Sequence, residues 1–286
     1  MTERHARITG VGSALPDRRV PNSYFESMVD TSDQWIQERT GIRERRFASE
    51  GETTSTLAAE AVARALESAG VRPDSVDLMI VGTCTPDRPL PSAAAFIQAR
   101  LGMTCPAFDL NAACAGFVYG LSVGGAQIRA GAADRVVVVG AEVLSRVLNM
   151  TDRTTCVLFG DGAGAAVLEP GDEPGLIESR LALDGTQAEL LTIRAGGTEE
   201  PTTEEAVRQL RTKIHMSDGQ AVFRQAVVAM AEACRELLDK AGLAASDLDA
   251  VIAHQANARI IAAVGKRLGI EPAKLYLDIA EVGNTS

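Results

Sequence analysis

The hydrophobic pattern alternates between short, continuously apolar runs and longer amphipathic segments. The apolar runs predict strands buried on both faces of a sheet, and they occupy residues 7–11, 77–82, 107–110 and 135–141. Helices are predicted over 55–69, ended by Gly70, and over 91–101. Residues 155–168 predict two strands around a Gly-Asp-Gly turn. Strands that alternate with helices indicate an α/β fold with a mostly parallel sheet.

A weak internal repeat relates the beginning of the chain to its end. Residues 67–80 (ESAGVRPDSVDLMI) align without a gap onto residues 239–252 (DKAGLAASDLDAVI), and this places Gly70 on Gly242. A helix, a glycine, a turn and a strand form a common succession, so one such match can arise by chance.

The same offset adds a second point of agreement, because it carries Cys114 to position 286, where the chain reads GNTS. Both points are predicted strand-to-helix junctions. We therefore predict two similar α/β domains, residues 1–172 and 173–286, joined at the Pro- and Gly-rich segment 169–175.

Composition and charge narrow the classes of function. The chain has 286 residues, of which 46% are hydrophobic and 23% charged, as is typical of a globular protein. A formal net charge of −10 argues against a nucleic-acid binder. Residues 110–128 are uncharged and near the length of a membrane span, but their polar side chains and glycines favour a buried central helix, so we expect no membrane partner. Five cysteines without a C-x-x-C pair indicate reduced thiols and a cytoplasmic location.

Three residues that can carry chemistry stand at predicted strand-to-helix junctions. Cys114 follows the strand 107–110, where a helix N-terminus would stabilise a thiolate; the alternative is a buried, inert cysteine. His254 follows a predicted strand over 249–253, and its alternative is a core histidine bonded to backbone. Asn284 stands at the third junction, where a helix N-cap is the alternative. Ligands in α/β sheets bind at the carboxyl ends of strands, so together the three predict one site.

Glycine runs and local basic clusters carry weaker signals. The run 160–164 (GDGAG) resembles a nucleotide loop, but a strand is predicted after it, so we interpret it as a turn. Trp35 opens a segment with four arginines, and Arg259, Lys266 and Arg267 follow His254 with no acid between them. These segments can be interpreted as solvated helix faces. Alternatively, Trp35 forms an aromatic platform for a base and the arginines bind phosphates.

Longer motifs in the chain resemble β-ketoacyl-acyl-carrier-protein synthase III, the initiating condensing enzyme of type II fatty-acid synthesis in the thiolase superfamily. They are DTSDQWI (30–36), RTGIR (39–43), PSAA (91–94), AACAGF (112–117), DR (152–153), FGDGAGA (159–165), HQANARI (254–260) and GNTS (283–286). The resemblance covers essentially the whole chain. It implies a thiolase-like five-layered αβαβα sandwich of two like halves, usually assembled as a homodimer.

The resemblance implies a Cys–His–Asn triad that needs no metal and no other cofactor. Cys114 would accept an acyl group from acyl-CoA. His254 and Asn284 would then stabilise the enolate formed when malonyl-acyl carrier protein loses CO2. Two alternatives stay open: an acyltransferase of secondary metabolism that uses acyl-Cys without decarboxylation, and a non-catalytic partner that dimerises with an active homologue.

The same resemblance implies roles for residues that bind the substrates. Trp35 and Arg153 would sandwich the adenine of CoA, Thr31 and Arg39 would line its tunnel, and Asn257 would contact the pantetheine arm. Two further roles concern protein partners. Leu90 would reach into the acyl pocket of the partner subunit and limit the size of the primer. The basic residues that would dock the acidic carrier protein are Arg259, Lys266 and Arg267.

The repeat also predicts that the second half is incomplete, because nothing in it corresponds to the helix and strands that follow Cys114. The family has a Gly-rich loop after the Asn motif, which contributes a backbone N–H to the oxyanion hole. Losing one such donor costs about 10²–10³ in rate. We expect a chain that ends at Ser286 to be poorly active or unstable, and a longer version to be active.

Overall fold

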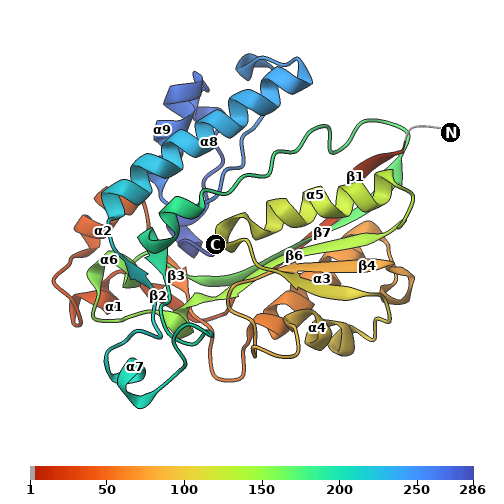
Figure 1. Ribbon diagram of the computed structural model, residues 1–286. Helices are drawn as coiled ribbons and strands as arrows, with labels where there is room; N and C mark the ends of the chain where they lie inside the picture. Colours follow the sequence, from red (N-terminus) through yellow and green to blue (C-terminus); the bar gives the residue numbers. More distant parts are fainter. Residues whose placement is uncertain (1–3) are drawn as a thin grey trace.

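A five-stranded mixed sheet is the largest element of the computed structural model, which describes residues 4–286 (Figure 1). The strand order is β1-β7-β6-β4-β5. β4 pairs in parallel with β5 and β6, whereas β7 runs antiparallel to β1 and β6. The strands are β1 His5–Ala14, β4 Leu78–Gly82, β5 Ala107–Leu110, β6 Val136–Val143 and β7 Asp161–Gly171.

The prediction of a mostly parallel sheet is therefore wrong. Parallel neighbours need a long crossover that returns the chain to the opposite end of the sheet. Residues 144–160 between β6 and β7 contain only short helical turns, so β7 runs straight back along β6. The prediction of two strands over 155–168 is also wrong. This segment begins within helix α6 (Arg153–Cys156), and the Gly-Asp-Gly sequence enters a single strand.

Helices cover both faces of the sheet and extend beyond it. They are α1 Ser23–Glu26, α2 Asp33–Thr40, α3 Thr54–Ala69, α4 Ala93–Leu101, α5 Gly116–Arg129, α6 Arg153–Cys156, α7 Glu204–Arg208, α8 Gly219–Ala241, α9 Ala258–Leu268 and α10 Ile279–Val282. Two small antiparallel pairs complete the regular structure. They are β2 Arg19–Pro21 with β3 Glu44–Arg46, and β8 Leu191–Thr192 with β9 His215–Met216.

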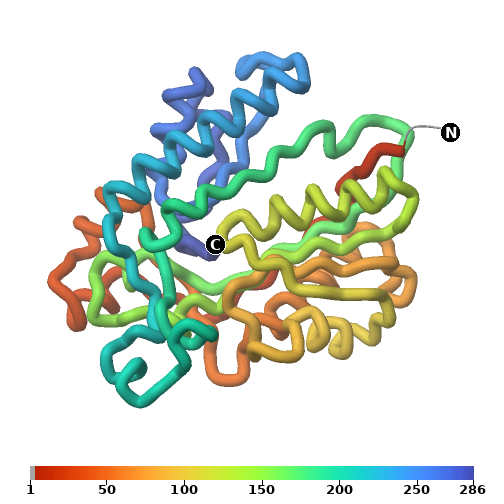
Figure 2. The backbone as a smooth tube through the Cα atoms, in the orientation of Figure 1, coloured from red at the N-terminus to blue at the C-terminus, as the bar shows by residue number. Residues whose placement is uncertain are grey.

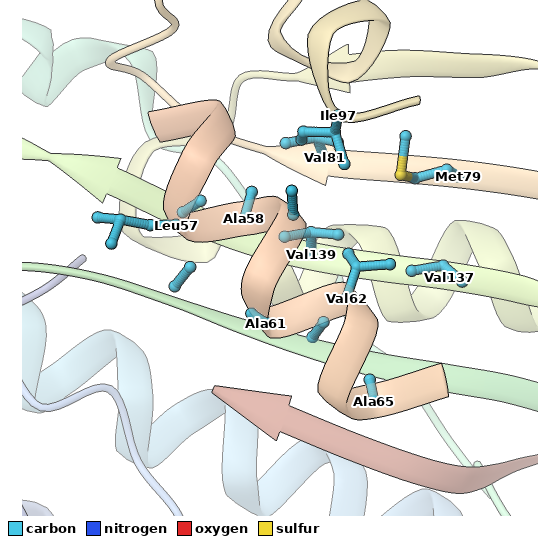
Figure 3. Packing of buried hydrophobic residues seen from close by; sticks show 14 of the residues in the cluster. Leu57, Ala58, Ala61, Val62, Ala65, Met79, Val81, Ile97, Val137 and Val139 are labelled. Atoms are coloured by element: carbon cyan, nitrogen blue, oxygen red, sulfur yellow. The ribbon is translucent and has the colours of Figure 1, made fainter. Parts of the chain in front are cut away.

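The run of valines in β6 is explained by burial on both sides of the sheet. Val137 and Val139 pack in the core beneath α3, which Figure 3 shows from close by, and Val136 and Val138 belong to the cluster beneath α5. A strand covered on both faces needs apolar side chains at every position. The helix on the first face is locally encoded, because Thr53 caps α3 and Gly70 ends it at a φ of 66°.

A close backbone contact fixes α5 against the carboxyl end of β4. A Cβ added at Gly82 would lie 2.7 Å from the carbonyl carbon of Gly116, the first residue of α5. Backbone atoms cannot move aside as a side chain can. We expect Gly82→Ala to lower the free energy of unfolding by about 1–3 kcal/mol in urea denaturation. Gly164→Ala in β7 is the control, because nothing lies within 4 Å of its added Cβ. Equal losses for the two variants would contradict this account of the contact.

The internal repeat is visible in the backbone. α3 ends at Gly70 (φ 66°) and α8 ends at Gly242 (φ 67°), and each is followed by a 3₁₀ turn. The two copies then differ. β4 lies between two strands, whereas Val251 forms only an isolated bridge with Leu275 in the described part of the chain. The strand predicted over 249–253 is therefore wrong.

Residues 172–190 run back alongside α5 toward α8, as the tube in Figure 2 shows. The Tyr119 hydroxyl donates to the carbonyl of Ala182 at 2.9 Å, and the Ser122 and Ser179 hydroxyls are 2.9 Å apart. α5 begins only at Gly116, so residues 110–128 are not one continuous helix. Among residues 4–286, no helix combines the length and apolar character that spanning a membrane requires.

Candidate active site

Cys114 lies between β5 and α5, at the carboxyl edge of the sheet. A 3₁₀ turn, Ala113–Ala115, contains it, and α5 begins two residues later. Ala113 has a φ of 45°, in the left-handed region that side chains other than glycine rarely adopt. Such local strain is often found beside functional residues. The predicted strand-to-helix position of Cys114 is confirmed.

The pKa of Cys114 is lowered from its ordinary value. Burial acts to raise this pKa, but the hydrogen bond and charge of His254 and a hydrogen bond from Ser286 outweigh burial. The other four cysteines of the chain all fall within the described residues, and burial raises the pKa of each of them. A thiolate therefore forms most readily at Cys114, the cysteine that the sequence singled out.

His254 reaches Cys114 from a loop before α9, not from the end of a strand as predicted. Its neighbour Gln255 holds that loop. The side-chain nitrogen of Gln255 donates to the carbonyls of Ala253 and Tyr276 at 3.0 and 3.1 Å, and its oxygen accepts from the N–H of Asp278 at 3.1 Å. These bonds join the loop to the segment that enters α10. Gln255 was not singled out from the sequence; its place beside the histidine was the available signal.

Asn284 is buried, follows α10 and forms an isolated parallel bridge with Phe159; the strand-to-helix junction at this position stays a prediction. Its backbone N–H donates to the carbonyl of Leu158, and its carbonyl accepts from the N–H of Gly160, both at 2.9 Å. The side-chain oxygen accepts from the N–H of Ser286 at 2.9 Å, which leaves the side-chain Nδ2 as the donor toward a substrate. A side-chain oxygen that accepts from the N–H two residues later also fits the N-cap alternative, which therefore stays open.

Two cavities meet at Cys114, and the chain end at Ser286 lies beside both, close to the start of α5 in Figure 1. The first has a volume of about 330 Å³ and mostly apolar walls, formed with Cys114 by Cys84, Leu144, Phe159, Ile193 and Ile214. The second, of about 400 Å³, is lined in part by Gly82, Phe117, Glu142, Asp278 and Ser286. An apolar cavity that opens on a nucleophile is suited to an acyl chain.

Glu142 is a buried carboxylate in the wall of the second cavity, and it was not predicted from the sequence. Burial raises its pKa, partly offset by hydrogen bonds from Thr85, Cys84 and Thr83. The Cys84 N–H donates to its carboxylate at 2.8 Å. These bonds hold residues 83–85, which line the acyl cavity in part, against β6. A lone acid inside the apolar run of β6 was the signal in the sequence.

Trp35 and Arg153, the predicted adenine sandwich, are neighbours in the structure. The Arg153 guanidinium lies 4.7 Å from the centre of the Trp35 ring, and that of Arg39 lies 6.0 Å from it. The Arg153 guanidinium therefore covers the ring face, and a base would have to separate the two groups. Thr31 precedes Trp35 by four positions and is half-buried. Its hydroxyl oxygen is buried and has no hydrogen-bond partner among the described residues. The place of Thr31 in the CoA tunnel stays a prediction.

Asn257 and Leu90 are placed less directly. The Asn257 side chain caps α9 by accepting from the Arg259 N–H at 2.8 Å, and it donates to the Arg39 carbonyl at 3.1 Å. Its contact with pantetheine stays a prediction. Leu90 is 84% exposed and lines neither cavity of its own chain at Cys114. Its role in a partner's acyl pocket also stays a prediction.

The three basic residues predicted to dock a carrier protein lie on α9. Arg259 is in its first turn and stacks 5.7 Å above the Phe223 ring of α8, and Lys266 and Arg267 are in its last turn. Arg259 and Lys266 are seven positions apart, so they lie on the same face of the helix. All three are exposed.

Comparison with known proteins gives the family. Residues 108–185 match the family model for 3-oxoacyl-[acyl-carrier-protein] synthase III, and residues 238–286 match the model for its C-terminal part. A β-ketoacyl-[acyl-carrier-protein] synthase III of Rhizorhabdus wittichii is 48% identical over 99% of this chain and 87% of its own length. A synthase III of Streptomyces coelicolor is also 48% identical, over 99% of this chain and 85% of its own.

Solved structures agree with these relatives. The 3-oxoacyl-[acyl-carrier-protein] synthase III of Aquifex aeolicus has a TM-score of 0.87 at 40% identity, covering 98% of this chain and 86% of its own. The priming β-ketosynthase of a polyketide biosynthetic pathway has a TM-score of 0.90 at 39% identity, covering 100% and 85%. The predicted thiolase-like α/β fold class is thereby confirmed. The chain belongs to the β-ketoacyl-[acyl-carrier-protein] synthase III family.

Proposed function

We propose that this condensing enzyme uses Cys114 as its acyl carrier and His254 and Asn284 as donors to the malonyl enolate. The observation that carries the proposal is the lowered pKa of Cys114, caused by His254 and Ser286 against the opposing effect of burial. The Ser286 N–H also donates to the Asn284 side chain, so the three candidate residues are linked through three contacts, two of which involve Ser286. In this proposal residues 1–172 form the domain with the nucleophile, and residues 173–286 form the domain with both donors.

Acylation comes first. The Cys114 thiolate attacks the thioester carbonyl of acyl-CoA, a new C–S bond forms, and the C–S bond to CoA breaks. The CoA sulfur leaves with the electron pair and takes a proton from His254, which regains one from water before condensation. The acyl chain then occupies the apolar cavity beside Cys114.

Condensation follows on malonyl-acyl carrier protein. The bond between the α-carbon and the malonyl carboxylate breaks, CO2 leaves, and the electron pair moves into the thioester carbonyl as an enolate. His254 and Asn284 Nδ2 donate to the enolate oxygen, where charge develops. The α-carbon attacks the acyl carbonyl, the C–C bond forms, and the bond to Cys114 breaks to restore the thiolate. These steps call on no cofactor.

We propose that Trp35, Arg153, Arg39 and Thr31 bind the nucleotide of acyl-CoA. We expect Trp35→Ala to raise the KM for acyl-CoA roughly 5- to 150-fold, as stacking of one base is worth about 1–3 kcal/mol. The kcat should stay near that of the unchanged protein, because the ring is remote from the reacting bonds. The measurement is steady-state kinetics. Acyl-pantetheine, which lacks the adenine, is the control; an equal rise in its KM would contradict the assignment.

Asn257 would contact the pantetheine arm that both substrates share.

We propose that Arg259, Lys266 and Arg267 dock the acidic carrier protein. We expect Arg259→Glu to raise the KM for malonyl-acyl carrier protein about tenfold, since like charges repel across an interface, and high salt should shrink the difference. Arg64→Glu, on α3 across the sheet, is the matched control. A change of the same size for malonyl-CoA, which needs no protein docking, would count against the assignment.

The protein partner of the active form would be a second copy of the chain, with Leu90 of each subunit entering the acyl pocket of the other and limiting primer length. A cytoplasmic location fits the pathway and the reduced cysteines. Sedimentation across a concentration series tests the dimer. A Leu90→Ala variant that accepted no longer primers than the unchanged protein would remove Leu90 from the acyl pocket.

The assay that decides the function supplies acyl-CoA and [¹⁴C-carboxyl]malonyl-acyl carrier protein, and follows released CO2 and the β-ketoacyl product together. The proposal expects one CO2 for each product molecule. Acyl transfer without CO2 would indicate the non-decarboxylating acyltransferase, and a folded protein that neither takes up acyl groups nor releases CO2 would indicate a non-catalytic partner.

A further inference from the structure

Arg45, in β3, is a fully buried cation that has no role in the proposed mechanism. Its exposed fraction is 0%, and burial lowers its pKa to about 10, so it is charged at neutral pH. Its guanidinium lies 4.7 Å from the centre of the Phe25 ring. A buried charge destabilises a fold unless polar groups compensate it.

The compensation comes from oxygens that are not carboxylates. Nη1 donates to the Val20 carbonyl at 3.1 Å and to Asn22 Oδ1 at 2.9 Å, and Nη2 donates to the Val157 carbonyl at 2.6 Å. None of the hydrogen bonds of Arg45 within residues 4–286 is made to an acid. The guanidinium thus ties the β2–β3 region to residue 157, more than 100 positions later in the chain.

Residue 157 begins the segment that holds Asn284. Leu158 and Gly160 make the two 2.9 Å backbone bonds to Asn284. The stem of Arg45 fills the space beside the same segment. A Cβ added at Gly283 would lie 2.9 Å from the Arg45 Cβ, and one added at Gly160 would lie 3.1 Å from it. Segment 157–160 and Gly283 flank the two backbone bonds of Asn284. The guanidinium and the aliphatic part of Arg45 therefore contact both of these segments.

We propose that Arg45 is a positioning residue for Asn284. It holds residues 157–160 through the Val157 carbonyl and packs against Gly160 and Gly283, so that Asn284 Nδ2 is fixed where the malonyl enolate oxygen develops. The inference rests on the proposed function of Asn284. Arg45 itself touches no substrate. Its removal should affect the step that needs Asn284 and leave the acylation of Cys114.

The test measures the two half-reactions separately in Arg45→Met and Arg45→Lys. Acylation is followed as the mass increment of intact protein with acyl-CoA, and decarboxylation as CO2 released from malonyl-acyl carrier protein. We expect decarboxylation to fall roughly 10- to 100-fold, the cost of a misplaced group, and acylation to change less than about threefold. Arg45→Lys keeps the charge and should recover part of the loss. Arg19→Met, which removes an exposed arginine from the adjoining β2, is the matched control.

A double-mutant cycle distinguishes positioning from general damage. If Arg45 acts through Asn284, Arg45→Met added to Asn284→Ala should cause no further loss of decarboxylation. Equal losses in both half-reactions, or additive losses in the cycle, would overturn the inference. If Arg45→Met does not fold, Gly160→Ala tests the same pairing, because its Cβ would lie 2.3 Å from the Val282 carbonyl. If the unchanged protein released no CO2, the proposed function would be overturned and the inference with it. If the unchanged protein condenses its substrates but Arg45→Lys slows acylation and decarboxylation equally, the inference alone is overturned.

Discussion

Cys114→Ala is expected to abolish acyl uptake and to reduce condensation roughly 10⁴- to 10⁶-fold, the usual cost of removing a covalent nucleophile. Intact-protein mass spectrometry with a series of short acyl-CoAs measures the first effect, and β-ketoacyl product formation measures the second. The reason is that the pKa of Cys114 alone among the cysteines is lowered, so this thiol supplies the thiolate. Malonyl decarboxylation should persist in the variant, since His254 and Asn284 remain.

Cys84→Ala is the matched control for this prediction. Cys84 lines the same acyl cavity as Cys114, but burial and the nearby Glu142 raise its pKa. It should therefore remain a neutral thiol, and its loss should leave the acyl increment intact. An increment that survived in Cys114→Ala and vanished in Cys84→Ala would transfer the nucleophile's role to Cys84.

His254→Ala and Asn284→Ala are expected to separate the two half-reactions. Both should lower malonyl decarboxylation about 10²- to 10³-fold, as removal of an oxyanion donor does. Only His254→Ala should also slow acylation, because His254 lowers the pKa of Cys114 and Asn284 does not contact the thiol directly. The measurement is the rate of acyl uptake beside the rate of CO2 release in each variant.

The pH dependence of Cys114 alkylation by iodoacetamide gives the sign of the electrostatic effect. Unchanged protein should be alkylated with an apparent pKa below the ordinary thiol value of 9.0, because His254 and Ser286 outweigh burial. In His254→Ala the opposing effect of burial prevails, so the midpoint should move to higher pH. In Asn284→Ala only the acceptor of the Ser286 N–H is lost, so the midpoint should move less than in His254→Ala. A midpoint that did not move in His254→Ala would mean that another group stabilises the thiolate.

Much of the structure around the five-stranded sheet could be predicted because its signals are local. The apolar run of β6 is buried on both faces, α3 carries its own cap at Thr53, and Gly70 ends it in the left-handed conformation. The repeat predicted the matching end of α8 at Gly242. The direction of each strand, in contrast, is not set by local sequence signals. β7 runs antiparallel because of the path taken by residues 144–160, and the predicted strand near Val251 finds only one bridging partner.

The sequence by itself determined the family and the place of Cys114 between a strand and a helix, and it predicted one site that joins this cysteine to His254 and Asn284. Only the tertiary structure decided how these residues are held and charged. Gln255, Glu142 and Arg45 each form hydrogen bonds between segments distant in the chain, and Arg153 stacks on Trp35 across more than 100 positions. The physical reason is that propensity and periodicity are set by neighbours along the chain. Burial, hydrogen-bond partners and pKa are set by neighbours in space.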